Sequence, residues 1–248
     1  MSYSRLLAVL AAWTLGSAHA GELTVAVAAN FAAPMQAIAA ILEKTTGHKA
    51  EVVIGATGKF YAQIKNGAPF DVFLAADNET PEKIESEGFG VPGSRFTYAK
   101  GKLVLWSANP ALVDAQGQVL KTGEFRKIAM AQPKVAPYGA AAMEAITQLG
   151  LAGRLGPRLV LGESIGQTFS FIATGNAELG FVAMSQVLEG GKLKSGSMWA
   201  VPSTLYQPIV QDAIVLTRGK DKPAVAALVT LLKSDRVKDL IRSYGYEL

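Results

Sequence analysis

Apolar residues are distributed along the chain in two alternating patterns. Short runs rich in small and β-branched residues, such as ELTVAVAA at 22–29 and DVFLAA at 71–76, are typical of buried parallel strands. Between such runs, apolar residues recur at helical spacing, as in the segment 31–46 that stops before Gly47. The alternation of strand and helix predicts an α/β fold with mainly parallel sheets.

The chain contains two blocks of this kind. In the first block we expect strands at 22–29, 50–54 and 71–76 and helices at 31–46 and 59–65. In the second block we expect strands at 103–106, 128–131, 159–161 and 179–183 and helices at 139–149 and 167–174. A strand at 209–216 and helices at 223–233 and 235–244 close the chain. We see neither an internal repeat nor a low-complexity linker.

Because no flexible linker separates the blocks, we expect two lobes joined by strand crossings, with a ligand cleft between them. We place the crossings near 100–102 and 202–207. Lobe 1 then comprises 21–100 and 206–248, and lobe 2 comprises 101–205. A single continuous sheet without a cleft is the alternative that the pattern leaves open.

The first twenty residues predict a cleavable secretory signal peptide. A short polar start with Arg5 precedes an apolar run, and Ala18-His19-Ala20 forms a small-x-small cleavage pattern. The apolar run is too short to cross a bilayer. A buried N-terminal helix is the alternative. We expect the mature chain to start at Gly21 and to be exported to a bacterial periplasm, untethered because no cysteine is present for lipidation.

Composition narrows the chemistry. The 248 residues are 50% hydrophobic and 18% charged, with no cysteine and two histidines. These counts exclude a disulfide scaffold, a thiolate metal site and a cysteine nucleophile. The net charge of +4 is scattered, without the basic block of a nucleic-acid-binding protein, and no nucleotide-binding motif occurs. We therefore expect no cofactor and no nucleic-acid partner.

Four turns stand out because each follows a predicted strand and precedes a predicted helix. They contain Asn30, Thr57, Tyr138 and Ile165. Ligands of open α/β sheets bind at this edge, where helix starts offer unpaired N–H groups and a positive partial charge. Two turns per lobe predict one compact anion site in the cleft, built without lysine or arginine. Taken singly, each residue is more typical of a helix cap, and Asn30 is of the N-cap type.

An exported α/β hydrolase is an alternative from another class. Asp71 and Asp77 flank a strand and Glu163 lies in a turn, where carboxylates can act as acids and bases. Such residues more often cap turns. His48, the one histidine after the leader, lies at a helix end, where we expect it to be solvated or to interact favourably with the helix dipole. A single histidine in that position is a poor general base. We expect Trp106 to lie in the core.

A resemblance to the periplasmic molybdate-binding proteins, the ModA family of molybdate ABC transporters, rests on five segments. They are VAVAANFAAPM (25–35), GATGKFYAQIKNGAPFDVFLAAD (55–77), APYGAAAMEAITQLG (136–150), ESIGQTFSFIATGNAELGFVAMSQV (163–187) and DLIRSYGYEL (239–248). The resemblance extends over essentially all of 21–248.

The resemblance implies a type II periplasmic-binding fold that holds molybdate or tungstate by hydrogen bonds, without direct metal ligands. Asn30 and Thr57 would donate from side chain and backbone, and Tyr138 and Ile165 mainly from backbone N–H groups. It also implies a monomer that performs no chemical step and delivers the oxyanion to a permease and its ATPase at the inner membrane.

The chain departs from many members of that family. They have serine at the positions of Asn30 and Thr57, and some have a tyrosine hydroxyl at the position of Ala183, where the N–H of Ala29 would have to compensate. Sulfate matches molybdate in charge and symmetry but is smaller, so cavity size must exclude it. A carrier of sulfate, phosphate or a ferric complex is the remaining alternative.

Overall fold

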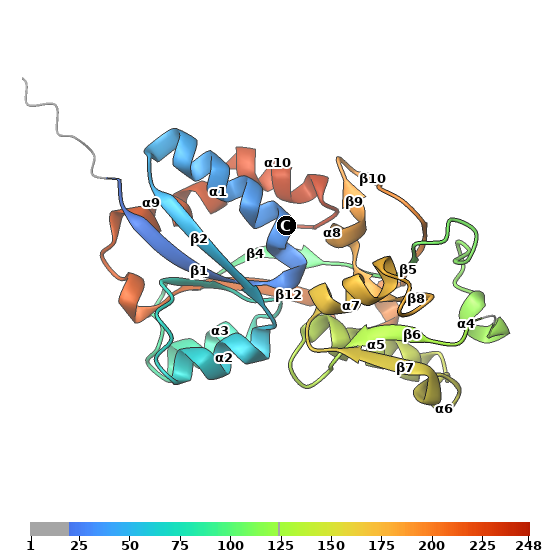
Figure 1. Cartoon of the computed structure of the whole chain (residues 1–248). Coiled ribbons are helices and arrows are strands. Elements are labelled where there is room, and N and C mark those ends of the chain that lie inside the picture. Colours follow the sequence, from blue (N-terminus) through green and yellow to red (C-terminus); the bar gives the residue numbers. More distant parts are fainter. Residues whose placement is uncertain (1–19, 124) are drawn as a thin grey trace, which may run out of the picture.

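Two lobes lie side by side in the structure, a computed structural model that describes residues 20–123 and 125–248 (Figure 1). Each lobe is built on a five-stranded sheet flanked by helices. The predicted two-lobed α/β fold is therefore confirmed. The predicted signal peptide, apart from Ala20, lies outside the described residues.

Lobe 1 contains the first part of the chain and its end. Its strands are β1 (Glu22–Ala28), β2 (Lys49–Gly55), β3 (Val72–Leu74), β4 (Phe96–Gly101) and β12 (Ile209–Val215). Its helices are α1 (Ala32–Thr46), α2 (Thr57–Lys65), α3 (Glu79–Ser86), α9 (Pro223–Lys233) and α10 (Asp235–Ser243), with the 3-10 turns η1 (Ala29–Phe31) and η4 (Thr217–Gly219).

Lobe 2 is formed by the middle of the chain. Its sheet contains β5 (Leu103–Ser107), β6 (Ile128–Ala131), β7 (Leu159–Gly162), β8 (Leu179–Ala183) and β11 (Ser197–Ala200), and β9 (Leu188–Glu189) forms a separate hairpin with β10 (Lys192–Leu193). Its helices are α4 (Val119–Thr122), α5 (Pro137–Gln148), α6 (Ala152–Leu155), α7 (Ile165–Ala173) and α8 (Met184–Val187), with the 3-10 turns η2 (Gly156–Arg158) and η3 (Ser203–Leu205).

The two sheets have the same mixed design. In lobe 1 the order is β2-β1-β3-β12-β4, with β1 parallel to β2 and β3 and β12 antiparallel to β3 and β4. In lobe 2 the order is β11-β5-β8-β6-β7, with β6 parallel to β7 and β8 and β5 antiparallel to β8 and β11. Parallel pairing thus holds for half of each sheet. The antiparallel half of each sheet contains the strands that border the crossings between the lobes, which are β4 and β12 in lobe 1 and β5 and β11 in lobe 2.

The chain crosses between the lobes twice. It passes from β4 to β5 at Lys102, and it returns between Ala200, the end of β11, and Ile209, the start of β12. The predicted lobe limits, after residues 100 and 205, stay a prediction; strand pairing places Gly101 with lobe 1, since it pairs with Ile209.

Helices cover both faces of each sheet. In lobe 1, α1, α9 and α10 lie on one face and α2 and α3 on the other (Figure 1). Helix α1 shows why: Met35, Ile38 and Leu42 share one face and are fully buried against the sheet, each contributing about 1.5–3 kcal/mol. Gly47, with φ of 76°, ends the helix in the left-handed conformation that favours glycine. In lobe 2, α5 and α7 take the two faces.

Several sequence-based details are wrong. Strands β4 and β11 and helix α3 were not expected, because their polar residues hide the pattern and pairing with β12 and β5 decides the strands. His48 is not solvated. It is 8% exposed, and its Nδ1 accepts a hydrogen bond from the N–H of Gly21 at 3.0 Å. The turn after Gly47 brings it against the start of β1.

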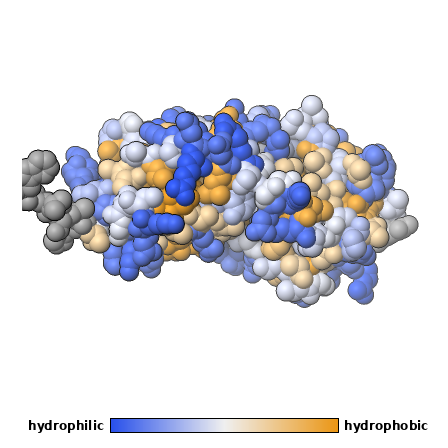
Figure 2. All heavy atoms as spheres, turned by 90° about the horizontal axis from the view of Figure 1, so that it is seen from above, coloured by the Kyte–Doolittle hydropathy of each residue, from blue (hydrophilic) through white to orange (hydrophobic). Residues whose placement is uncertain are grey.

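Within residues 20–123 and 125–248, no helix has the length and apolar character needed to cross a bilayer. On the face shown in Figure 2, hydrophilic residues surround smaller apolar areas on both lobes.

Candidate functional site

The four predicted turns all lie where the lobes face each other. Each one connects a parallel strand to a helix start: β1 to η1, β2 to α2, β6 to α5 and β7 to α7. Strand register pairs Ala28 with Gly55 in lobe 1 and Ala131 with Gly162 in lobe 2. Neighbouring strands therefore end side by side, and both lobes present their pair of turns at the same edge.

These turns line one small cavity between the lobes. Its wall is formed by Ala28, Ala29, Asn30, Gly55, Ala56, Thr57, Ala76, Ala136, Pro137, Tyr138 and Ile165. All four predicted site residues are in this set, and none of them is more than 4% exposed. No charged side chain of the described residues belongs to the wall. The structure thus brings together residues from four segments that are distant in sequence.

Thr57 presents two donors at this wall. It is the first residue of α2, and no backbone carbonyl of the described residues accepts from its N–H. Its Oγ1 accepts from the N–H of Ala76 at 3.0 Å. The hydroxyl oxygen is thereby oriented, and its hydrogen is left for a ligand.

In lobe 2 the donors come from the backbone. Tyr138 and Ile165 lie in the first turns of α5 and α7, and in the described part of the chain no backbone carbonyl accepts from their N–H groups. The Tyr138 side chain does not add a donor to the cavity wall, since its hydroxyl accepts a hydrogen bond from Gln211 Nε2 at 3.1 Å. Ser164 caps α7 by accepting from the Gln167 N–H. The start of α7, and with it the Ile165 N–H, is therefore held in place by the preceding residue, Ser164.

Asn30 does not cap a helix, so the N-cap interpretation is wrong. It lies inside η1, and the N-cap position of α1 is occupied by Phe31. The Asn30 Nδ2 donates to Gln211 Oε1 at 2.8 Å and to the Tyr246 hydroxyl at 2.9 Å. Its Oδ1 is buried and has no hydrogen-bond partner among the described residues. Long-range contacts, rather than the local helix, set its conformation.

The partners of Asn30 belong to a buried polar cluster that the sequence reasoning missed. We call it the hinge network; its members are Asn30, Tyr98, Tyr138, Ser185, Gln211 and Tyr246. Burial raises the pKa of Tyr98, Tyr138 and Tyr246, because the phenolate would lose its hydration. These hydroxyls therefore stay protonated near neutral pH. One available signal was the pair Gln211 and Asp212, two polar residues inside a strand that is otherwise apolar.

Three contacts close the lobes over the cavity. The Gly58 N–H of lobe 1 donates to the Val135 carbonyl of lobe 2 at 3.0 Å. Lys59 of lobe 1 forms an ion pair with Glu163 of lobe 2, and the hydrogen bond from Lys59 lowers the pKa of the Glu163 carboxyl. In addition, the Ser185 hydroxyl donates to the Asn30 carbonyl at 2.8 Å.

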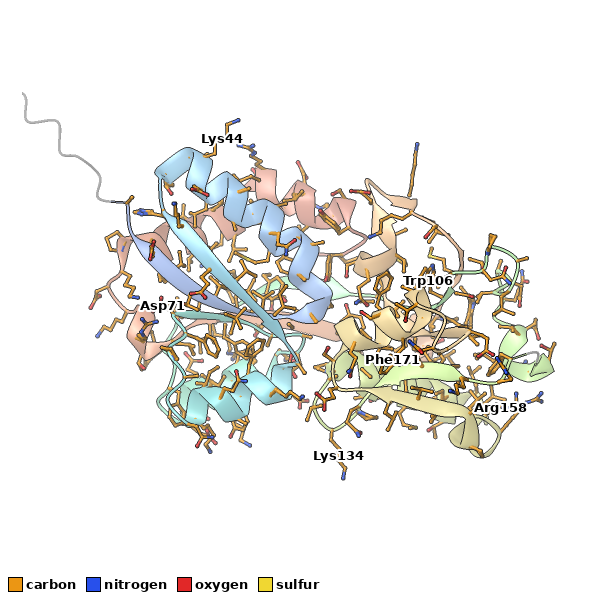
Figure 3. The ribbon with its side chains drawn as sticks, viewed as in Figure 1. Lys44, Asp71, Trp106, Lys134, Arg158 and Phe171 are labelled. Atoms are coloured by element: carbon orange, nitrogen blue, oxygen red, sulfur yellow. The ribbon has the colours of Figure 1, made fainter. Side chains whose placement is uncertain are left out.

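The candidate acid–base residues do not assemble. Asp71 is buried in lobe 1, at a distance from lobe 2 (Figure 3). Its carboxylate accepts a hydrogen bond from the Thr24 N–H and forms an ion pair with Lys222 at 2.8 Å. Asp77 accepts two hydrogen bonds from Thr80, and burial raises the pKa of its carboxyl. None of these residues, nor Glu163, lines the cavity. In the described ranges no three histidine or carboxylate side chains gather as they would around a metal ion.

Two further expectations concern neighbouring positions. Ala183 offers no hydroxyl, and its N–H donates to Gln186 Oε1 at 3.0 Å, whereas Ala29 does belong to the cavity wall. Trp106, labelled in Figure 3, is 3% exposed and lies in the core of lobe 2, as expected. Its ring stacks on that of Phe169.

Comparison with known proteins places this geometry in a family. The family of bacterial extracellular solute-binding proteins matches residues 23–247. The chain is 58% identical over 248 residues to the molybdate-binding protein ModA of Azotobacter vinelandii, covering 100% of this chain and 98% of that protein. It is 52% identical over 229 residues to the ModA of Rhodobacter capsulatus, covering 92% of this chain and 89% of the relative.

A solved structure agrees with both. The periplasmic molybdate-binding protein of Azotobacter vinelandii superposes with a TM-score of 0.88 at 43% sequence identity, covering 91% of this chain and 99% of that one. The chain therefore belongs to the bacterial extracellular solute-binding proteins and, within them, to the ModA family.

Proposed function

We propose that this protein captures molybdate, and tungstate with little discrimination, and delivers the oxyanion to an ABC permease and its ATPase. One observation carries the proposal: four helix starts from two lobes surround a small cavity whose wall has no charged side chain. Membership of the ModA family supports the choice of oxyanion.

The donor set suits a fully deprotonated dianion. Helix starts carry a positive partial charge, and their N–H groups are unpaired until an anion arrives. A buried donor left without a partner costs about 1–3 kcal/mol, so the closed cavity favours a ligand that accepts in several directions. Phosphate, which is partly protonated, is better served by a carboxylate acceptor, and the cavity wall contains no carboxylate.

We also propose where and in what form the protein works. We infer that residues 1–20 direct export, that the mature chain works in the periplasm as a monomer, and that binding and release involve no chemical step. Asn30, Thr57, Tyr138 and Ile165 are the proposed ligand-binding residues, all by hydrogen bonds and without a direct bond to the metal atom.

A thermal-shift titration tests the assignment. Saturation at a hundred times Kd stabilises the folded state by about 2.7 kcal/mol, which for a chain of this size raises Tm by roughly 5–10 °C. We expect this shift with micromolar molybdate and tungstate and none with sulfate. The absence of a shift with both metal oxyanions contradicts the assignment, and an equal shift with sulfate makes the protein a general oxyanion carrier.

Thr57 provides the sharpest single substitution. Thr57→Val removes the hydroxyl donor at nearly constant volume, so we expect the Kd for molybdate to rise roughly ten- to hundredfold, the equivalent of about 1.5–3 kcal/mol for a hydrogen bond to a charged group. Calorimetry measures it. Thr57→Ser is the matched control, because it keeps the hydroxyl that accepts from the Ala76 N–H. Equal affinity of the valine and serine variants means that Thr57 is merely structural.

A further inference from the structure

Three of the four proposed ligand-binding residues are followed directly by glycine, in the first turn of a helix. The pairs are Thr57-Gly58, Tyr138-Gly139 and Ile165-Gly166. Helices normally disfavour glycine. None of these three glycines has a positive φ, so the backbone conformation itself does not require a residue without a side chain. What distinguishes the three positions is the space around each of them.

Helices α2 and α7 start where the two lobes face each other, and the glycine in the first turn of each faces the opposite lobe (Figure 1). A Cβ atom on Gly58, in lobe 1, would lie 3.0 Å from the Cα and 3.2 Å from the carbonyl oxygen of Val135 in lobe 2. A Cβ atom on Gly166, in lobe 2, would lie 3.2 Å from the Cβ of Ala29 in lobe 1. Carbon atoms in contact normally stay about 3.5–4.0 Å apart. We call Gly58 and Gly166 the closure glycines.

The neighbours of the closure glycines cannot turn aside to make room. For Gly58 the nearest atoms all belong to Val135, and two of them are backbone atoms. The Gly58 N–H also donates to the Val135 carbonyl at 3.0 Å, which holds the two backbones together. For Gly166 the nearest atom is the Cβ of Ala29, whose position the backbone fixes, whereas Ser164 of the same lobe would be at an ordinary contact distance of 3.6 Å. A methyl group at either glycine therefore fits its own lobe and meets the other one.

The closure glycines lie beside the donors of the oxyanion site. Thr57 directly precedes Gly58, Ile165 directly precedes Gly166, and both donor residues line the cavity. Ala29, which faces Gly166, lines it as well. Added methyl groups would hold the lobes apart here by roughly 0.3–0.5 Å. Donors on opposite sides of the cavity could then no longer all reach one compact anion within hydrogen-bond distance, about 2.7–3.2 Å.

We propose that Gly58 and Gly166 are positioning residues of the oxyanion site: the absence of a side chain at each one sets how closely the lobes approach, and thereby the width of the cavity around a tetrahedral oxyanion. This inference rests on the proposed function, with molybdate as the probe. It assigns a role in binding to two residues that do not line the cavity. Gly139 differs from them, because the atoms that confine it belong to Ala131 and Gln132 of its own lobe.

Calorimetry and thermal unfolding of two variants are the first test. Gly58→Ala and Gly166→Ala should each raise the Kd for molybdate about tenfold, because the donors of one lobe are held away from the anion. The Tm of the ligand-free protein should stay the same or rise by up to about 3 °C, because alanine is the better helix residue and the empty lobes can separate. Gly153→Ala, in α6 with open space around it, is the matched control and should bind molybdate like wild type.

The two measurements together decide the outcome. Weaker binding without a loss of Tm supports a role between the lobes. Wild-type affinity in either variant overturns the role of that glycine. A ligand-free Tm several degrees below wild type also overturns it, because the glycine would then be needed within its own lobe. If wild type binds neither molybdate nor tungstate, the proposed function fails, and this inference falls with it.

Exchange of a methyl group between the lobes is the second test. Ala29→Gly removes the Cβ atom that the methyl group added in Gly166→Ala would meet. The double variant Ala29→Gly/Gly166→Ala therefore moves one methyl group from lobe 1 to lobe 2 and leaves the space between them occupied once. It should bind molybdate more tightly than Gly166→Ala alone, and the two changes should be non-additive in a double-mutant cycle. Fully additive losses of affinity would mean that the added methyl group acts within lobe 2, which overturns the role of Gly166 in closure.

Discussion

The two lobes reach the same cavity by different means. Lobe 1 brings side chains, the Thr57 hydroxyl and the Asn30 amide, in addition to its backbone. Lobe 2 brings the first turns of α5 and α7, where Tyr138 turns its hydroxyl to Gln211 and Ile165 has no polar side-chain atom. In lobe 1 the identity of a residue determines which polar group lies at the cavity wall. In lobe 2 the path of the backbone does.

Backbone donors place a steric demand on their surroundings. At Gly139, directly after Tyr138, a Cβ atom would lie 2.3 Å from the carbonyl oxygen of Ala131 and 3.1 Å from the carbonyl carbon of Gln132. The first turn of α5 can approach the end of β6 because this side chain is absent. The position of the Tyr138 N–H therefore depends on Gly139, a neighbouring residue without a side chain.

The largest effect should follow from filling that space. We expect Gly139→Ala to destabilise the protein by about 3 kcal/mol, because the clash is with backbone that cannot move aside, and to weaken molybdate binding as α5 shifts. Urea unfolding and calorimetry measure the two effects. Gly153→Ala, in a helical position with open space around it, is the matched control and should cost nothing. Equal stability of the two variants would show that lobe 2 is not constrained in this way.

An intermediate effect is expected at the contact between the lobes. Lys59 and Glu163 are both exposed, so Glu163→Gln should raise the Kd for molybdate by about threefold at most, mainly through faster release. Since Lys59 lowers the pKa of Glu163, the ionised pair favours closure above that pKa and is lost as pH falls through it. The difference between wild type and variant should therefore vanish in acid and in high salt. Stopped-flow release rates at several pH values measure it, and a pH-independent difference contradicts the ion-pair role.

The smallest effect should come from changing a side chain in lobe 2. Ile165→Val keeps the backbone N–H, so we expect the Kd for molybdate to stay within about twofold of wild type, with a loss of about 0.5–1.5 kcal/mol in stability. Measured beside Thr57→Val, it compares the two lobes directly. A tenfold loss of affinity in Ile165→Val would mean that the shape of this side chain, and not its backbone alone, belongs to the site.

Much of the framework is local and was therefore predictable. Apolar runs and helical spacing gave most strands and helices, and the strand-to-helix turns at Asn30, Thr57, Tyr138 and Ile165 follow from that order. Parallel strands end at one edge, so turns in one lobe had to be neighbours. Helix α2 begins at Thr57, two residues before the predicted start, because small residues at a helix start carry no periodic signal.

Contacts between distant segments decided the rest. At Asn30 the sequence allows a helix cap as the alternative to a ligand donor, yet the structure shows its amide held by Gln211 and Tyr246, 181 and 216 residues away. His48 was read as solvated, yet it is buried against Gly21. The sequence by itself determined the family, the turns and the type of donor each turn can offer. Only the tertiary structure decided which polar groups are hydrogen-bonded to each other, because a hydrogen bond between distant segments leaves no pattern in the local spacing of residues.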